Sequence, residues 1–143
     1  MQRAPIPTNE SEYTLYVFHR ADEITGARVT VFTIQTTREF ANFRYGLHVE
    51  ASYSPQSKVF SFTIGGISAP ASLLPGTGSA QGVHAYPDLK PGEYFIKVHK
   101  GKTETNEFVL HVEKDGLRVT PSPSTSKQFI TAAIGESESP AAH

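Results

Sequence analysis

The sequence predicts a single all-β domain, and three observations carry this prediction. β-branched and aromatic residues gather in short runs, several runs alternate apolar with polar residues, and Gly-, Pro- and Asp-containing turns separate them. About eight such runs predict one antiparallel β-sandwich or a partly open barrel of short strands. The 143 residues are enough to bury a core without disulfides or metal ions.

Residues 12–19 and 27–34 predict the first two strands, because both runs are rich in β-branched and aromatic residues. Turn-forming residues at 22–26 predict a hairpin between them. The first run is apolar on both faces, since Tyr16 and Phe18 lie opposite its other apolar residues. We therefore expect this strand to be central in a sheet or covered on its second face.

The clearest two-residue alternation runs through residues 42–53. Its apolar phase holds Phe43, Tyr45, Leu47, Val49, Ala51 and Tyr53. This pattern predicts a strand with one face in the core and the other in water. Residues 59–64 repeat the pattern. The Pro- and Gly-rich segment 68–82 predicts an extended loop, with a short anchor at Leu73 and Leu74.

Residues 93–100 and 103–113 predict a second hairpin, and a turn signal at 115–116 precedes a short last strand at 117–119. The Pro/Ser composition of 121–126 is typical of a linker.

Beyond that linker, residues 127–134 form a short apolar segment with the spacing of one or two helical turns. We expect a short C-terminal tail there that is helical or irregular. The predicted organisation is an extended N-terminal arm at 1–11, an antiparallel β domain at 12–120, and a linker with a docking tail at 121–143.

The sequence offers no constellation for catalysis. It has no cysteine, which excludes thiolate nucleophiles, disulfides and cysteine-held metal clusters. It contains no nucleophile elbow, zinc-binding helix motif or phosphate-binding loop. The six histidines are scattered singly, and the carboxylates form no inward-facing pair. We therefore predict a protein that is not an enzyme, with no catalytic, cofactor-binding or metal-binding residues of its own.

A basic hairpin at 90–102 is the first candidate binding site. This segment contains four lysines and one acidic residue, Glu93, which gives it a local charge of about +3 on a chain of net charge -1. Lys97, His99, Lys100 and Lys102 are the residues predicted to bind a partner. A lysine-rich edge strand that prevents aggregation explains the same residues, and the sequence leaves both readings open.

The apolar tail is the second candidate. Phe129, Ile130 and Ile134 must be buried somewhere, either on their own domain or on another subunit, and the sequence leaves this choice open. The N-terminus has no secretory h-region, and no stretch is apolar enough to span a bilayer, so we expect a cytoplasmic protein.

Three segments together resemble a known family. They are EYTLYVFHR at 12–20, KPGEYFIKVHKGK at 90–102 and PSPSTSKQFITAAIGE at 121–136. With the length and the lack of cysteine and tryptophan, they resemble the small peripheral D subunits (PscD) of the green sulfur bacterial, homodimeric type I photosynthetic reaction centre.

The resemblance implies a peripheral subunit on the cytoplasmic side of the inner membrane. Its implied partners are the reaction-centre core subunit, the iron–sulfur subunit and the Fenna–Matthews–Olson antenna protein. The resemblance also implies that the subunit assists electron transfer to ferredoxin. Bacteriochlorophyll and iron–sulfur clusters would then belong to the neighbouring subunits. Two alternatives stay open: a free-standing immunoglobulin-like or transthyretin-like protein-binding module, and a small-ligand-binding β-barrel.

Overall fold

The structure is a computed structural model that describes residues 11–40, 45–69, 78–123 and 127–135, and the regular structure of these residues is all β-strand. The strands of this described part are β1 (Tyr13–Ala21), β2 (Arg28–Phe40), β3 (Gly46–Ser54), β4 (Val59–Ser68), β5 (Gly78–Pro87), β6 (Gly92–Lys100), β7 (Glu104–Glu113), β8 (Gly116–Pro121) and β9 (Ile130–Ile134). They form one nine-stranded sheet in the order β8-β7-β6-β4-β3-β5-β2-β1-β9.

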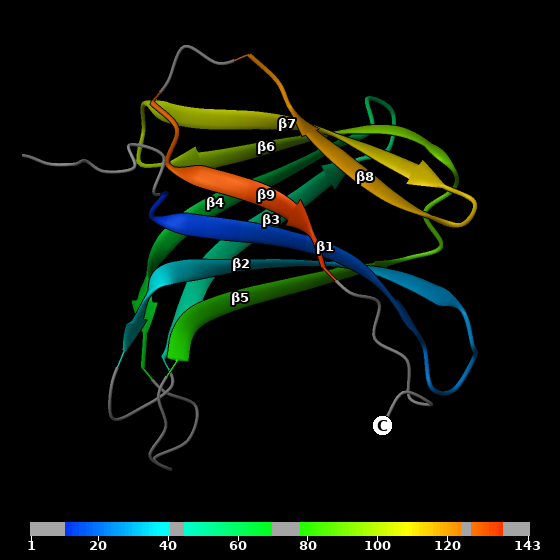
Figure 1. Ribbon diagram of the computed structural model, residues 1–143, viewed down its shortest axis with the longest axis horizontal. Helices are drawn as coiled ribbons and strands as arrows, with labels where there is room; N and C mark the ends of the chain where they lie inside the picture. The colour runs from blue at the N-terminus through cyan, green and yellow to red at the C-terminus, as the bar shows by residue number, and fades with distance from the viewer. Residues whose placement is uncertain (1–10, 41–44, 70–77, 124–126, 136–143) are drawn as a thin grey trace, which may run out of the picture.

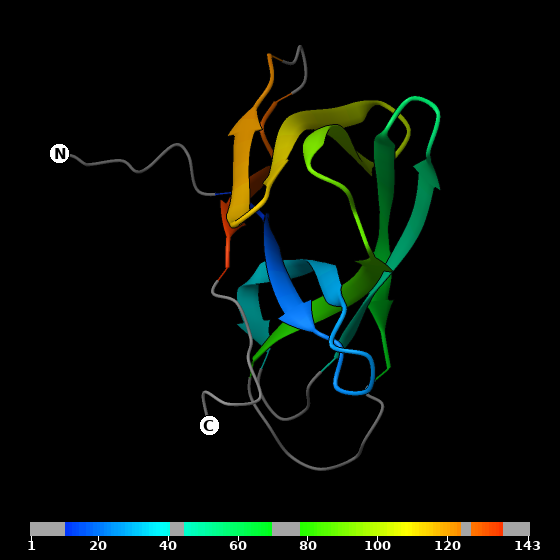
Figure 2. The same ribbon diagram turned by 90° about the vertical axis from the view of Figure 1, so that its right-hand side faces the viewer.

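This sheet curls into a nearly closed barrel (Figures 1 and 2). Its two end strands, β8 and β9, come into contact without pairing as neighbours in the sheet. The predicted all-β class is confirmed, and of the two expected architectures the chain adopts the partly open barrel. The sheet is not wholly antiparallel, because β1 pairs with β9, β3 with β5 and β4 with β6 in parallel.

The hairpin predicted between the first two strands is present and has a specific turn. The Asp22 carboxylate accepts hydrogen bonds from the backbone N–H groups of Ile24 (2.8 Å) and Thr25 (3.0 Å), and Gly26 takes the left-handed conformation with φ +74°. The N–H groups of Thr25 and Ile24 favour the charged carboxylate and lower the pKa of Asp22.

The core lies inside the barrel and follows the predicted alternation. In β3, Leu47 and Val49 are buried while His48 and Glu50 are exposed; Phe43, from the same predicted phase, lies outside the described residues. The core is rich in aromatic rings: the Phe32 ring centroid lies 4.8 Å from that of Phe60. Such close ring contacts fill the barrel interior and stabilise it beyond simple area burial.

The predicted loop at 68–82 is wrong for its second part, because β5 begins at Gly78. A Cβ on Gly82 would lie 2.7 Å from Val49 Cγ2 and 2.8 Å from the Leu47 carbonyl oxygen. Glycine therefore permits β5 to pass close to β3, which is a packing role and not a turn role. The predicted anchor at Leu73 and Leu74 lies outside the described residues.

The helical or irregular tail is also corrected, because Ile130–Ile134 forms β9. This strand pairs in parallel with β1, from Tyr13 opposite Ile130 to Val17 opposite Ile134. An open sheet edge offers unpaired backbone groups, and the β-branched residues of β9 suit a strand, so tertiary pairing overrides a weak local helical preference. The β domain therefore continues past 120 and includes this segment.

The side chain of Asn106 holds the beginning of β9 against β7. Its Oδ1 accepts hydrogen bonds from the N–H groups of Phe129 (2.9 Å) and Ile130 (3.3 Å), and its Nδ2 donates to the Lys127 carbonyl oxygen (3.3 Å). Asn106 is itself buried. One side chain thus supplies the partners that a neighbouring strand would otherwise provide.

Candidate binding surfaces

The lysines of the basic hairpin do not share one face. Lys97 and His99 alternate with the buried residues of β6 and so point outward, whereas Lys100 ends the strand on the core-facing phase and Lys102 lies in the exposed turn. The structure therefore separates the residues that the sequence grouped as one site.

Lys100 is occupied by interactions within the domain. Its Nζ lies 2.5 Å from a carboxylate oxygen of Glu12 and 3.9 Å from one of Glu104, and it stands 5.8 Å from the centre of the Phe129 ring. The hydrogen bond to Glu12 raises the pKa of Lys100. Lys100 thus joins β6 to the residue that precedes β1 and covers the buried Phe129.

Two other residues of the hairpin lie beside polar side chains of neighbouring strands. Lys97 lies opposite Glu107 in the β6–β7 register. The imidazole of His99 is within hydrogen-bond distance of two hydroxyl groups, those of Ser61 (Nε2, 3.1 Å) and Thr105 (Nδ1, 3.0 Å). With Glu12 and Glu104 beside Lys100, the hairpin has less unbalanced positive charge than its sequence alone indicates.

The three predicted tail residues differ in accessibility. Phe129 is 2% exposed and Ile130 is fully buried, so both side chains are part of the barrel core and are not accessible to a partner in this structure. Ile134, at the end of β9, is 40% exposed. The tail packs on its own domain, which decides the question that the sequence left open for residues 129–134.

An apolar surface lies on the outside of the barrel, over three neighbouring strands. We call it the β1–β2–β5 face; it consists of Tyr16, Phe18, Val29, Val31, Thr33, Val83 and Ala85. Cross-strand pairing places these residues in rows: Thr33 lies between Tyr16 and Val83, and Val31 lies between Phe18 and Ala85. Val83 is 53% exposed and Ala85 is exposed, whereas Tyr16 and Phe18 are half-buried. The residues that β2 contributes, Val29, Val31 and Thr33, are buried.

This face differs from the outer surface of β3, where His48, Glu50, Ser52 and Ser54 are polar and exposed. Sequence reasoning singled out Tyr16 and Phe18 but missed Val83, because it assigned most of the segment before Val83 to a loop. The missed signal was the β-branched and aromatic content of 83–86, next to residues that the glycine-rich composition marked as irregular.

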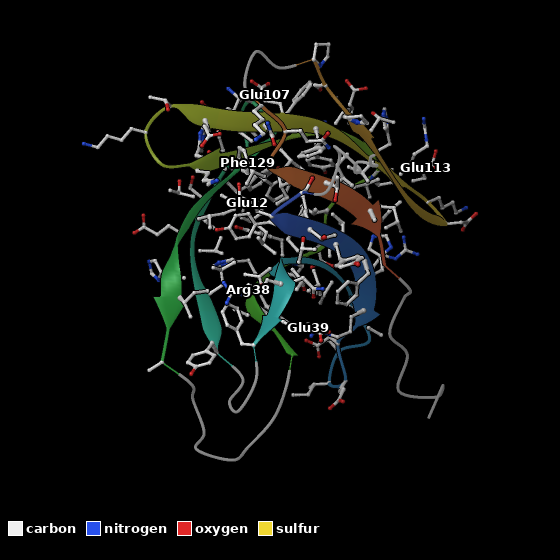
Figure 3. All side chains as sticks on the ribbon, turned by 60° about the vertical axis from the view of Figure 1, so that its left-hand side comes forward. Glu12, Arg38, Glu39, Glu107, Glu113 and Phe129 are labelled. Atoms are coloured by element: carbon white, nitrogen blue, oxygen red, sulfur yellow. The ribbon has the colours of Figure 1, made fainter. Side chains whose placement is uncertain are left out.

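A pocket of about 560 Å³ opens at the end of the barrel where β1 begins and β2 ends. We call it the barrel mouth; it is lined by Ser11, Glu12, Tyr13, Thr36, Thr37, Arg38, Phe40 and Ile67. Two of these lining residues, Glu12 beside the start of β1 and Arg38 near the end of β2, are labelled in Figure 3. Burial, followed by the nearby Glu12 carboxylate, raises the pKa of Tyr13. Sequence reasoning did not single out the residues that line the barrel mouth.

The described residues bring together no group of three or more metal-ligating side chains. The described part of the chain has no helix that is long and apolar enough to cross a membrane. Comparisons with protein-family models, with curated proteins and with solved structures find no match to this chain.

Proposed function

We propose that this chain is a non-catalytic peripheral subunit of a photosynthetic reaction centre, on the cytoplasmic face of the inner membrane. In this role it stabilises the iron–sulfur subunit and the Fenna–Matthews–Olson antenna protein on the core subunit, and it assists electron transfer to ferredoxin. The proposal of a particular assembly rests on the sequence resemblance. The proposal of a protein-binding role rests on the accessible apolar side chains of the β1–β2–β5 face, which are the exposed Val83 and Ala85 and the half-buried Tyr16 and Phe18.

The composition of that face supports docking to a protein. The outer surface of a free barrel is expected to be polar, and a contiguous apolar patch on it marks an interaction site. Tyr16 and Phe18 are anchors of the kind that dominate binding energy at protein interfaces, because aromatic side chains bury a large area. Val83, 53% exposed, extends the patch onto β5.

The polar side chains on the opposite outer face support a non-catalytic role. Ser61, His99 and Thr105 form a row in the order of a nucleophile and its base. The third member is a hydroxyl and not the carboxylate that would stabilise a charged imidazole. The row also lies on the outside of the sheet, and neither of the two pockets described for this part of the chain includes it.

The proposal is tested by retention on native membranes. The purified chain and its variants are added to bacteriochlorophyll-containing membranes that have been stripped of the endogenous subunit with a chaotrope, and bound protein is measured after sedimentation. Val83→Glu and Val83→Lys should each reduce retention about tenfold or more, because either charge would be buried without a partner at an apolar interface. Opposite charges with the same effect would show that apolar contact matters more than electrostatics.

Thr63→Glu and Thr63→Lys are the matched controls, since Thr63 is an exposed outward residue in the middle of β4. They should leave retention unchanged. Equal retention of the Val83 and Thr63 variants would rule out docking through the β1–β2–β5 face. Failure of the unmodified chain to bind these membranes would overturn the reaction-centre assignment itself.

A further inference from the structure

The barrel mouth contains polar groups that the fold does not use. Ser11 is 8% exposed, and its Oγ is buried with no hydrogen-bond partner. Buried hydroxyl groups normally have a partner, because leaving one unpaired costs about 1–3 kcal/mol. Its position in the lining of the barrel mouth makes a bound molecule the natural partner for this hydroxyl.

The neighbouring threonine hydroxyls are already engaged. Thr36 Oγ1 donates to the Arg38 carbonyl oxygen (2.7 Å) and accepts from the Ala80 N–H (3.0 Å). Thr37 Oγ1 donates to the Ser11 carbonyl oxygen (2.6 Å). The Thr37 bond joins the end of β2 to the residue before Glu12, and the Ala80 bond joins β2 to β5. The pocket wall is therefore built by the fold and does not have to form around a ligand.

Arg38 supplies a free positive charge at this site. Its guanidinium stands 5.4 Å from the centre of the Phe40 ring, and none of the ion pairs among the described residues involves it. Glu12 also lines the pocket, but its carboxylate is paired with Lys100 at 2.5 Å. The charge left for a ligand to neutralise is therefore positive.

The remaining walls are apolar and aromatic. Phe40 packs edge-on against Tyr45 with ring centroids 5.6 Å apart, and Ile67 is 46% exposed. These side chains offer a surface for a hydrocarbon body beside the guanidinium and the hydroxyl groups. A volume of about 560 Å³ lies within the range of about 300–1,000 Å³ that is usual for small-molecule sites.

We propose that the barrel mouth binds a small amphipathic carboxylate. Its carboxylate group pairs with the Arg38 guanidinium and accepts a hydrogen bond from the Ser11 hydroxyl, and its apolar body lies against Phe40 and Ile67. This site is separate from the β1–β2–β5 face, and the proposal does not depend on the role in a reaction centre.

The test uses a matched pair of fluorescent probes, pyrene-1-butyrate and the neutral 1-pyrenebutanol, titrated into the purified full-length chain. Pyrene-1-butyrate should bind saturably at one site. Arg38→Met keeps most of the side-chain length and removes the charge, so it should weaken binding of the butyrate about tenfold and of the alcohol less than about twofold. Ser11→Ala should weaken binding of the butyrate several-fold.

Arg118→Met is the control, because Arg118 is an exposed arginine on β8 and does not line the mouth. It should leave the affinity for both probes unchanged. Amide NMR shifts caused by pyrene-1-butyrate should centre on residues 11–13 and 36–40, and this readout does not depend on any variant.

Three results would overturn the proposal. The first is no saturable binding at probe concentrations up to about a hundredfold above that of the protein. The others are an equal loss of affinity for both probes in Arg38→Met, and amide NMR shifts that centre outside residues 11–13 and 36–40. Because the experiment uses the isolated chain without membranes, its failure is distinguishable from failure of the proposed function.

Discussion

His19 has an unusual environment for an ionisable residue. It follows Leu15 and Val17 on the core-facing phase of β1, and its Nε2 is buried with no hydrogen-bond partner among the described residues. Burial disfavours the imidazolium form, and the positive charge of Arg28 adds to this effect, so the pKa of His19 is lowered from 6.5. The folded state thus holds His19 neutral where an unfolded chain would begin to protonate it.

This lowered pKa predicts acid sensitivity. Between pH 6.5 and the lower folded pKa, the unfolded state binds more protons than the folded state, so the free energy of unfolding falls as the pH falls. Urea denaturation at about pH 7.5 and about pH 5.5 should show a lower midpoint at the acidic pH. His19→Gln should remove most of that difference.

His48→Gln is the comparison variant, because His48 is exposed on the outer face of β3. It should keep the full acid-induced decrease. An unchanged pH dependence in His19→Gln would assign the effect to other titrating groups.

At the scale of an element, β9 is the segment on which closure of the barrel depends. It covers the edge of β1 by parallel pairing and contacts β8. Its first residue, Ile130, and the preceding Phe129 are buried in the core. Its first backbone groups are held by Asn106. A segment with these contacts stabilises the folded domain and is not a free docking tail.

Phe129→Ala should therefore lower the free energy of unfolding by about 3–5 kcal/mol, because it removes a large buried ring and leaves a cavity. Ile134→Ala removes a side chain that is 40% exposed and should cost less than about 1 kcal/mol. Urea denaturation of the isolated chain measures both values. Similar small losses for the two variants would mean that β9 contributes little to the stability of the free domain.

At the scale of the whole molecule, apolar contact and not overall charge is expected to dominate partner binding. The net charge is -1, and the lysines of the basic hairpin are divided between faces or paired with carboxylates. We therefore expect membrane retention of the chain to change less than about threefold between 50 and 300 mM salt, since screening weakens only the electrostatic part of binding.

The double variant Lys97→Glu with Lys102→Glu distinguishes this expectation from docking through the basic hairpin. If the β1–β2–β5 face docks, retention of this variant should stay close to that of the unmodified chain at low salt. A large loss that disappears at high salt would instead support the original prediction of an electrostatic site at Lys97 and Lys102.

The sequence by itself determined the class of fold and much of the strand pattern. The alternation through Leu47 and Val49 identified a core-facing phase correctly, because a strand in contact with one core must place apolar residues at every second position. The turn residues at 22–26 likewise predicted the first hairpin, since an Asx turn and a left-handed glycine depend on adjacent residues only.

Only the tertiary structure decided how those strands close into a barrel and which side chains meet at its surfaces. Gly82 allows β5 to lie close to Leu47 and Val49. Phe129 contacts β7 and the start of β1, although more than 100 residues of sequence separate it from the start of β1. The barrel mouth joins Ser11 to Arg38 and Ile67 from separate segments. Local sequence patterns carry no information about such partners, because the contacts depend on strand order and register in the folded sheet.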